Sequence, residues 1–196
     1  MTPHPQGARL WLVRHAAPQV APGTCYGALD VPADPAATQT AARRLAAALP
    51  RPAGIFCSTL QRCEQLGQSL CAERPDLMLI FDARLREMDF GAWEGRAWNT
   101  IAKSDIDAWT ADFAHHAPGG GEPLCHLLGR VALALQAARQ WSAQHAGVDV
   151  AWITHAGVAR CVAWLQQHGE GVMPRPDNWP VAAPGWGEWE VRDLRG

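Results

Sequence analysis

Two short apolar runs, far apart in the sequence, constrain the fold of this chain more than any other feature. Residues 10–13 form one run and residues 150–154 the other. Short continuous apolar runs are typical of strands that are buried on both faces of a parallel sheet. A histidine follows each run, His15 after Arg14 and His155 directly. Because open parallel sheets bind ligands at the carboxyl ends of their strands, we expect both histidines at one ligand-binding edge.

Segments typical of strands and helices alternate along the whole chain. Strands are expected at residues 9–13, 53–57, 77–81 and 150–154, with a late edge strand at 188–192. Helices are expected at residues 35–49, 60–70, 104–116, 122–144 and 157–167, the first capped by Asp34 with Pro35 at its first position, the second capped by Ser58 and Thr59. This order predicts a single α/β domain over residues 1–196, a three-layer sandwich whose mostly parallel sheet carries helices on both faces.

Composition excludes several classes of partner. The chain has 196 residues, 48% of them hydrophobic and 18% charged, and a formal net charge of −2. This balance gives no broad basic field for nucleic acid or for an anionic membrane surface, so an anionic substrate needs a local cluster of arginines. Residues 1–7 do not have the pattern of a signal peptide, and no apolar run reaches the ~18 residues of a membrane helix. We expect a soluble, cytoplasmic protein of undetermined oligomeric state.

The cysteines and tryptophans are interpreted mainly as packing residues. The six cysteines contain no C-x-x-C pair and no cysteine–histidine cluster with ligand spacing, so we expect free thiols and no metal site. Most of the ten tryptophans are expected in or near the core, while a few could wall a pocket for an aromatic ligand.

The hypothesis that best unites the polar residues is phosphoryl transfer. A phosphate monoester brings about two negative charges and requires fixed cations with oriented N–H donors. Arg14 precedes His15, and Arg62 lies in the first turn of the helix after the second expected strand. Taken alone, Arg62 is typical of a solvated surface residue, and a lone histidine at a strand end is usually structural. Two histidines at equivalent strand ends, with arginines nearby, favour a functional site.

Each residue then has an expected role. His15 is the nucleophile, with one ring nitrogen free and the other held by a backbone carbonyl. His155 donates hydrogen bonds to the transferring phosphoryl group, a role favoured if an anionic ligand keeps it protonated. Glu87, in the irregular segment 84–99, is the candidate acid for the leaving alkoxide, and Asp89 is a weaker one. Such an acid needs its pKa raised by desolvation or by a neighbouring carboxylate, and Glu87 taken alone is more typical of a surface carboxylate.

Other motifs fit poorly. His115 and His116 are adjacent and cannot face the same way on a helix, and no H-E-x-x-H occurs. The run Gly119-Gly120-Gly121 lacks the lysine of a P-loop and is interpreted as a flexible start to the helix after it. No G-x-S-x-G motif for a serine nucleophile is present.

Five segments in order resemble one known family. They are Leu12-Val13-Arg14-His15, Ser58-Thr59-Leu60-Gln61-Arg62, Leu85-Arg86-Glu87 with Phe90-Gly91-Ala92-Trp93-Glu94-Gly95, Pro118-Gly119-Gly120-Gly121-Glu122 through Arg130, and Thr154-His155-Ala156-Gly157. Together they resemble the motifs of the histidine phosphatase superfamily, whose fold is that of the cofactor-dependent phosphoglycerate mutases. The resemblance covers residues 9–165 and implies a phosphohistidine on His15 that water hydrolyses, with no metal and no other cofactor.

Within that superfamily, residues 25–32 resemble a loop of the alpha-ribazole phosphatases, which act late in cobalamin nucleotide-loop assembly. The substrate implied is alpha-ribazole 5′-phosphate, a small phosphoester whose aromatic base would contact Tyr26 or a tryptophan such as Trp93.

The chain also departs from the family pattern. Ala16 stands where the family usually has glycine, and Ala17-Pro18 replace a Glu-Thr pair. Ala16 keeps its backbone N–H as a substrate-binding donor, but its methyl narrows the pocket and Pro18 removes one donor. Lower phosphate affinity is the expected result. Two alternatives therefore stay open: a phosphatase for another small phosphoester, and a non-catalytic phosphoester-binding protein.

Overall fold

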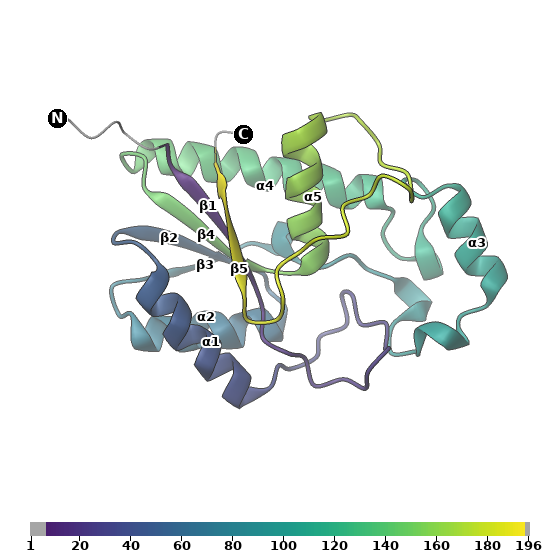
Figure 1. Cartoon of the computed structure of the whole chain (residues 1–196), viewed down its shortest axis with the longest axis horizontal. Helices are drawn as coiled ribbons and strands as arrows, with labels where there is room; N and C mark the ends of the chain where they lie inside the picture. Colours follow the sequence, from purple (N-terminus) through teal and green to yellow (C-terminus); the bar gives the residue numbers. More distant parts are fainter. Residues whose placement is uncertain (1–6, 195–196) are drawn as a thin grey trace.

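A five-stranded sheet forms the centre of the computed structural model, which describes residues 7–194 (Figure 1). The strand order is β3-β2-β4-β1-β5, from β1 (Arg9–Arg14), β2 (Ala53–Cys57), β3 (Leu79–Phe81), β4 (Asp149–Thr154) and β5 (Trp189–Asp193). All neighbouring pairs are parallel except β1 and β5, which are antiparallel. The mostly parallel sheet and the edge position of the last strand are confirmed. The expectation about a signal peptide concerns residues 1–7, of which only Gly7 is described.

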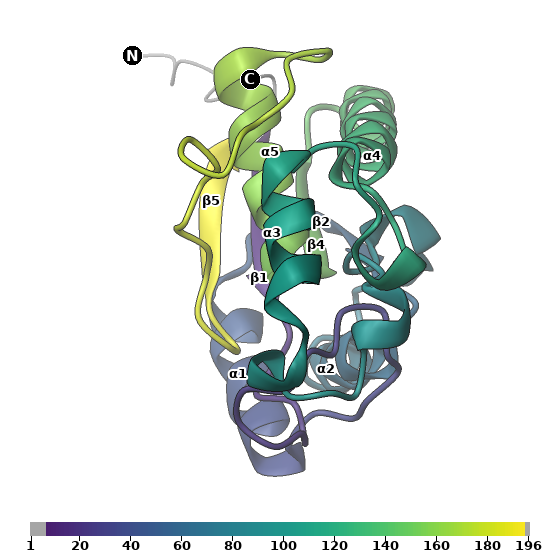
Figure 2. The same ribbon diagram turned by 90° about the vertical axis from the view of Figure 1, so that its right-hand side faces the viewer.

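Helices cover both faces of the sheet, as expected for a three-layer α/β fold. The α-helices are α1 (Pro35–Ala48), α2 (Gln61–Glu73), α3 (Lys103–Ala111), α4 (Leu124–Gln144) and α5 (Ala156–His168), and the 3-10 turns are η1 (Ala83–Leu85), η2 (Gly91–Trp93), η3 (Trp98–Thr100) and η4 (Pro118–Gly120). Figure 1 shows α1 and α2 on one face and α4 and α5 on the other. Figure 1 shows α3 away from both layers, and Figure 2, turned by 90°, shows α3 in front of the sheet. No helix within residues 7–194 combines the length and apolarity needed to cross a lipid bilayer.

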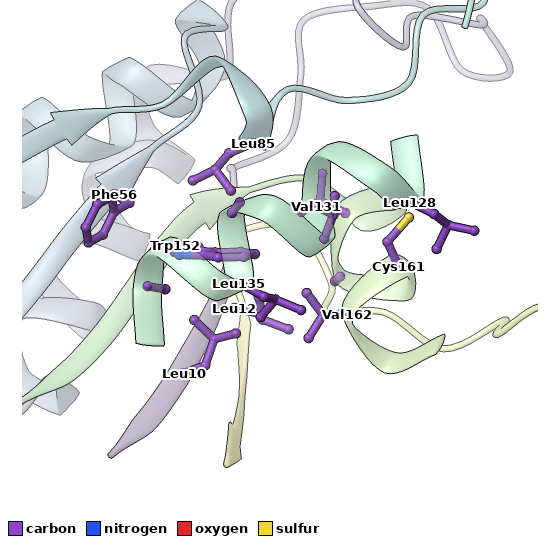
Figure 3. Packing of buried hydrophobic residues seen from close by; sticks show 14 of the residues in the cluster. Leu10, Leu12, Phe56, Leu85, Leu128, Val131, Leu135, Trp152, Cys161 and Val162 are labelled. Carbon is purple, nitrogen blue, oxygen red and sulfur yellow. The ribbon is translucent and has the colours of Figure 1, made fainter. Parts of the chain in front are cut away.

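The two apolar runs bury both of their faces, which explains why they show no alternation. Leu10, Leu12 and Trp152 pack into the cluster beneath α4 and α5 (Figure 3), whereas Val13 and Ile153 pack beneath α1 and α2. Each of these side chains is almost fully buried. Burial of a large apolar side chain contributes roughly 1.5–3 kcal/mol. The two strands that carry the histidines are therefore among the most firmly held parts of the fold.

Several element boundaries differ from the prediction. The third strand begins at Leu79 rather than at residue 77, because the chain before it turns and Leu77 N–H donates to the Arg74 carbonyl. Helix α3 ends at Ala111 rather than at residue 116, because the backbone leaves helical geometry at Asp112. That turn allows Phe113 to contact Trp179, with 6.2 Å between ring centroids.

Ser58 and Thr59 do not cap α2 as predicted, because the helix begins at Gln61 with no side-chain cap. Gly119 and Gly121 lie so close to backbone carbonyls of residues 89–90 that a Cβ on either would overlap them, and the flexibility of this run stays a prediction. In contrast, Asp34 caps α1 as predicted, its carboxylate accepting from the Ala37 N–H at 2.7 Å.

Candidate active site

The adjacent, parallel β1 and β4 bring the two histidines together. Arg14 pairs with Thr154 in register, and the backbone N–H of His15 donates to the Thr154 carbonyl at 3.1 Å. His155 is the N-cap of α5 and follows β4 directly. The two imidazole rings lie with their centroids 5.1 Å apart, and both side chains are 1% exposed. The strand order therefore produces the expected pairing at the carboxyl edge.

His15 is held as a neutral ring with a defined proton. Its Nδ1 lies 2.7 Å from the Ala16 carbonyl oxygen, which can only accept. Nδ1 therefore carries the proton and Nε2 keeps its lone pair. Burial, followed by the nearby guanidinium of Arg62, lowers the pKa of His15 to about 3. The buried Ala16 thus serves this site through its carbonyl.

His155 is also neutral in this structure. Burial lowers its pKa well below the usual value, and the charge of Arg62 acts in the same direction. Its Nε2 lies 2.9 Å from the Ser58 hydroxyl, while its buried Nδ1 has no hydrogen-bond partner. The prediction that His155 is kept protonated depends on an anionic ligand and stays a prediction.

The two arginines are fixed by carbonyl oxygens. Arg62 is fully buried, and its two terminal nitrogens donate to the carbonyls of Leu29 at 2.8 Å and Gly27 at 2.6 Å. Its guanidinium also lies 5.4 Å from the centroid of the Tyr26 ring. Arg14 donates through Nη1 to the Pro184 carbonyl at 3.1 Å. Burial of Arg62 places a fixed positive charge beside both imidazoles.

The unpaired buried donors are concentrated at this site. Within residues 7–194, four buried side-chain nitrogen or oxygen atoms have no hydrogen-bond partner: Nε of Arg14, Nε of Arg62, Nδ1 of His155 and Nε1 of Trp109. Leaving a buried donor unsatisfied costs about 1–3 kcal/mol. Three of the four donors belong to the predicted anion-binding residues. A ligand rich in acceptor oxygens, such as a phosphoryl group, would satisfy them.

Glu87 reaches the same edge from the segment after β3. Its Oε2 accepts from the Gly157 N–H at 3.0 Å, and its Oε1 accepts from the Met88 N–H at 3.0 Å. A Cβ on Gly157 would overlap Oε1, so any larger residue there would require the Glu87 carboxylate to move. Asp89 is exposed and accepts from the Gly91 N–H instead. Of the two candidate acids, only Glu87 lines the cavity beside His15.

That cavity has a volume of about 390 Å³ and combines charged and aromatic walls. Its lining includes Arg14, His15, Thr24, Tyr26, Glu87, Phe90, Trp98, Trp109, Phe113, Gly157, Arg160 and Trp179. Tyr26 is placed as expected. Trp93 is not: it is buried in a separate cluster with Cys25 and Ile101 and does not line the cavity. The tryptophan rings that line the cavity are those of Trp98, Trp109 and Trp179.

Comparison with known proteins decides the family. The model of the histidine phosphatase superfamily (branch 1) matches residues 10–175. The chain belongs to this superfamily. It is 30% identical over 141 residues to phosphoglycerate mutase-like protein 4 of Arabidopsis thaliana, covering 68% of this chain and 60% of that protein. It is 28% identical over 118 residues to a metal-independent phosphoserine phosphatase of the same plant, covering 57% and 48%. The chain thus spans about half to three fifths of these curated relatives.

A solved structure extends the comparison to nearly the whole chain. The alpha-ribazole phosphatase from Shigella flexneri superposes with a TM-score of 0.73 at 27% identity, covering 93% of this chain and 89% of the other. The resemblance inferred from five sequence motifs is therefore confirmed at the level of the superfamily and its fold.

Three residues that support the candidate site, Ser58, Gly157 and Arg130, were not assigned a role in that site from the sequence. Ser58 bonds His155, Gly157 bonds Glu87, and Arg130 donates to the carbonyls of residues 84, 86 and 87 while pairing with Glu122. Each lies inside a motif quoted above, so position within a motif was the available signal. All six cysteines are free, and no cluster suited to a metal ion occurs in the described part of the chain.

Proposed function

We propose that this protein is a phosphomonoesterase that forms a covalent phosphohistidine on His15. The observation that carries the proposal is the hydrogen bond between Nδ1 of His15 and the Ala16 carbonyl, which leaves the lone pair on Nε2. The neighbouring Arg14, Arg62 and His155 supply buried donors that have no acceptor of their own. A neutral nucleophile beside unpaired donors suits attack on a phosphate monoester.

The reaction proceeds in two balanced steps. Nε2 of His15 attacks phosphorus, and the bond between phosphorus and the ester oxygen breaks. Arg14, Arg62 and His155 donate to the three equatorial oxygens, and Glu87 gives its proton to the leaving alkoxide. Water then loses a proton to Glu87 and attacks phosphorus. The bond between phosphorus and Nε2 breaks, inorganic phosphate leaves and His15 is regenerated as the neutral imidazole.

The covalent intermediate provides the test. The protein is mixed with p-nitrophenyl phosphate, quenched within one turnover, and assayed for acid-labile phosphate bound to protein. The intact chain should carry label, His15→Ala should carry none, and His115→Ala should match the intact chain because His115 is exposed and does not line the cavity beside His15. Tight phosphate binding without label in the intact chain would instead favour the non-catalytic binding protein.

The finer proposal is that the substrate is alpha-ribazole 5′-phosphate and that the enzyme acts in cytoplasmic cobalamin assembly. Two observations support it: the likeness to an alpha-ribazole phosphatase at 27% identity, and the aromatic wall beside His15. Phe90, Trp98, Trp109 and Phe113 contact one another edge-on, stacked or tilted, with ring centroids 5.3–6.5 Å apart. Such rings can stack on a flat base. Tyr26 would border the same base from the Arg62 side.

A substrate panel tests this choice. Alpha-ribazole 5′-phosphate should exceed phosphoserine in kcat/KM, and Trp98→Ala should raise KM about 10-fold for the aromatic substrate alone, since an aromatic contact contributes about 0.5–1.5 kcal/mol. The alternative, a phosphatase for another small phosphoester, is favoured by Arg160, which lines the cavity and could pair with a substrate carboxylate. Equal turnover across the panel, or a preference for phosphoserine, would select that alternative.

A further inference from the structure

The contact between Ser58 and His155 is buried from solvent on both sides, because both residues are almost fully buried. Ser58 lies between β2 and α2 and is 0% exposed, and its backbone N–H donates to the Ile153 carbonyl at 2.9 Å. Its hydroxyl oxygen is 2.9 Å from Nε2 of His155. The Leu60 N–H also points at that oxygen, at 3.4 Å. The hydroxyl therefore has a donor on one side and the imidazole on the other.

The hydrogen-bonding capacities of these groups constrain where the protons lie. A neutral imidazole has one N–H and one lone pair, whereas a hydroxyl both donates and accepts. Ser58 accepts from Leu60, and the strong acceptor for its own proton is Nε2 of His155, since the Cys63 sulfur, which also contacts the hydroxyl, accepts only weakly. If the serine donates to Nε2, the single proton of His155 must be on Nδ1. Nδ1 is the buried atom that has no partner.

A second neighbour does not change this assignment. The Cys63 sulfur lies 3.5 Å from Nε2, but its thiol donates to the Thr154 carbonyl, also at 3.5 Å. Burial raises the pKa of Cys63 to about 12, so the thiol keeps its proton. Because a thiol is a weak donor at long range, the serine hydroxyl is the stronger partner of Nε2.

We propose that Ser58 is a positioning residue that donates to Nε2 of His155 and so holds that ring as the Nδ1–H tautomer. Phosphoryl oxygens carry no proton to give, so only this tautomer lets a neutral His155 donate to them. The inference rests on the proposed function for its consequence in catalysis, but the tautomer itself can be measured without turnover. A wrong tautomer in an otherwise intact site is known to be costly in other enzymes.

The direct test is 15N NMR of the full chain labelled with 15N-histidine, recorded on the free protein and with inorganic phosphate. The signals of His155 are assigned as those that disappear in the His155→Gln variant. We expect a protonated Nδ1 and an unprotonated Nε2 in both samples, which departs from the ligand-protonated His155 expected from the sequence. A protonated Nε2 in either sample, whether in the opposite tautomer or in an imidazolium, overturns the proposal. The NMR measurement requires neither a Ser58 variant nor enzymatic activity. Its result therefore does not depend on whether the protein is a phosphatase.

Variants test the consequence for turnover. Ser58→Ala should lower kcat for p-nitrophenyl phosphate about 10- to 100-fold with little change in KM, the range seen when a residue that orients a ligating histidine is lost. Ser58→Thr should recover most of that loss. The matched control is Ser142→Ala, because Ser142 is equally buried and its hydroxyl donates to the Val148 carbonyl at 2.7 Å, before β4 and away from the site.

The outcomes separate cleanly. A Ser58→Ala protein that folds and keeps kcat within about threefold of the Ser142→Ala control overturns the positioning role. An intact chain that never forms phosphohistidine overturns the proposed function, while the NMR result still decides the tautomer.

Discussion

Replacing Gly157 by alanine should separate the acid from the rest of the site. An added Cβ would overlap Oε1 of Glu87 and lie only 2.9 Å from Cδ and 3.2 Å from Oε2. The carboxylate must therefore move, and the hydrogen bond from the Gly157 N–H, 3.0 Å long, is lost. Loss of a bond to a charged group costs about 1.5–3 kcal/mol, while glycine to alanine in a helix returns about 1 kcal/mol. We expect a net destabilisation of about 1 kcal/mol and a fully folded protein.

The effect on catalysis should depend on the leaving group. General acid catalysis contributes about 10²- to 10⁴-fold when an alkoxide must be protonated. The p-nitrophenolate ion is a stable leaving group that needs little protonation. Gly157→Ala should therefore lower kcat/KM for an alkyl phosphate such as alpha-ribazole 5′-phosphate about 10²-fold or more. The loss for p-nitrophenyl phosphate should stay below about 10-fold.

The assay compares kcat/KM for the two substrates, because this ratio reports the transfer to His15 rather than the later hydrolysis. Gly129→Ala is the matched control, since Gly129 is in the exposed part of α4 and a Cβ there meets nothing within 4 Å. That control should be active and slightly more stable. Equal losses for both substrates in Gly157→Ala would refute the assignment of Glu87 as the acid.

Three further predictions follow from the contacts of single residues. Arg62→Lys should raise the inhibition constant of inorganic phosphate by at least about 10-fold. The reason is that a lysine ammonium cannot donate to the carbonyls of Gly27 and Leu29 and also bind an anion through two parallel hydrogen bonds. An unchanged inhibition constant would contradict this. The folded pKa of His15 is about 3 and its unfolded pKa about 6.5, so the unfolded chain binds more protons and stability falls as the pH decreases through that window. In urea titrations, the free energy of unfolding of His15→Gln should therefore fall by about 1.4 kcal/mol less per pH unit than that of the intact chain as the pH decreases from 6 to 4. Parallel pH dependences for the two proteins would argue that the buried ring is not neutral. Arg130→Leu should lower the free energy of unfolding by about 2 kcal/mol, because Glu122 and the carbonyls of residues 84, 86 and 87 lose their donor. Urea denaturation would measure this loss of stability, and alkyl phosphate turnover would measure its effect on catalysis.

The parts of the site that follow from strand topology were predictable. Apolar runs identify buried strands, and parallel strands end at the same edge, so His15 and His155 could be placed together before any coordinates. Arg62 followed by the same reasoning, since the helix after β2 begins at that edge. These inferences depend only on the apolar pattern of the strands and on the shared carboxyl edge of a parallel sheet.

The parts that depend on the path of irregular segments were not predictable. Trp93 and Trp98 are equally aromatic in the sequence, yet the turns η2 and η3 bury Trp93 at 4% exposure and leave Trp98 at 37%. Ser58 looked like a helix cap because serine commonly caps helices, but its hydroxyl satisfies a distant histidine. Local preference cannot decide between two partners when one of them is 97 residues away.

The last stretch of the chain matters more than the family match suggests. The match ends at residue 175, but the Pro184 carbonyl binds Arg14, and Gly187 and Glu188 exchange backbone hydrogen bonds with Arg14 and His15. Trp186 also covers the Arg14 guanidinium, 5.3 Å from its ring centroid. A protein trimmed to the matched region would keep every motif residue and still lose the contacts that residues 184–188 make with Arg14 and His15. Shortened forms prepared for crystallisation or screening should therefore extend through β5.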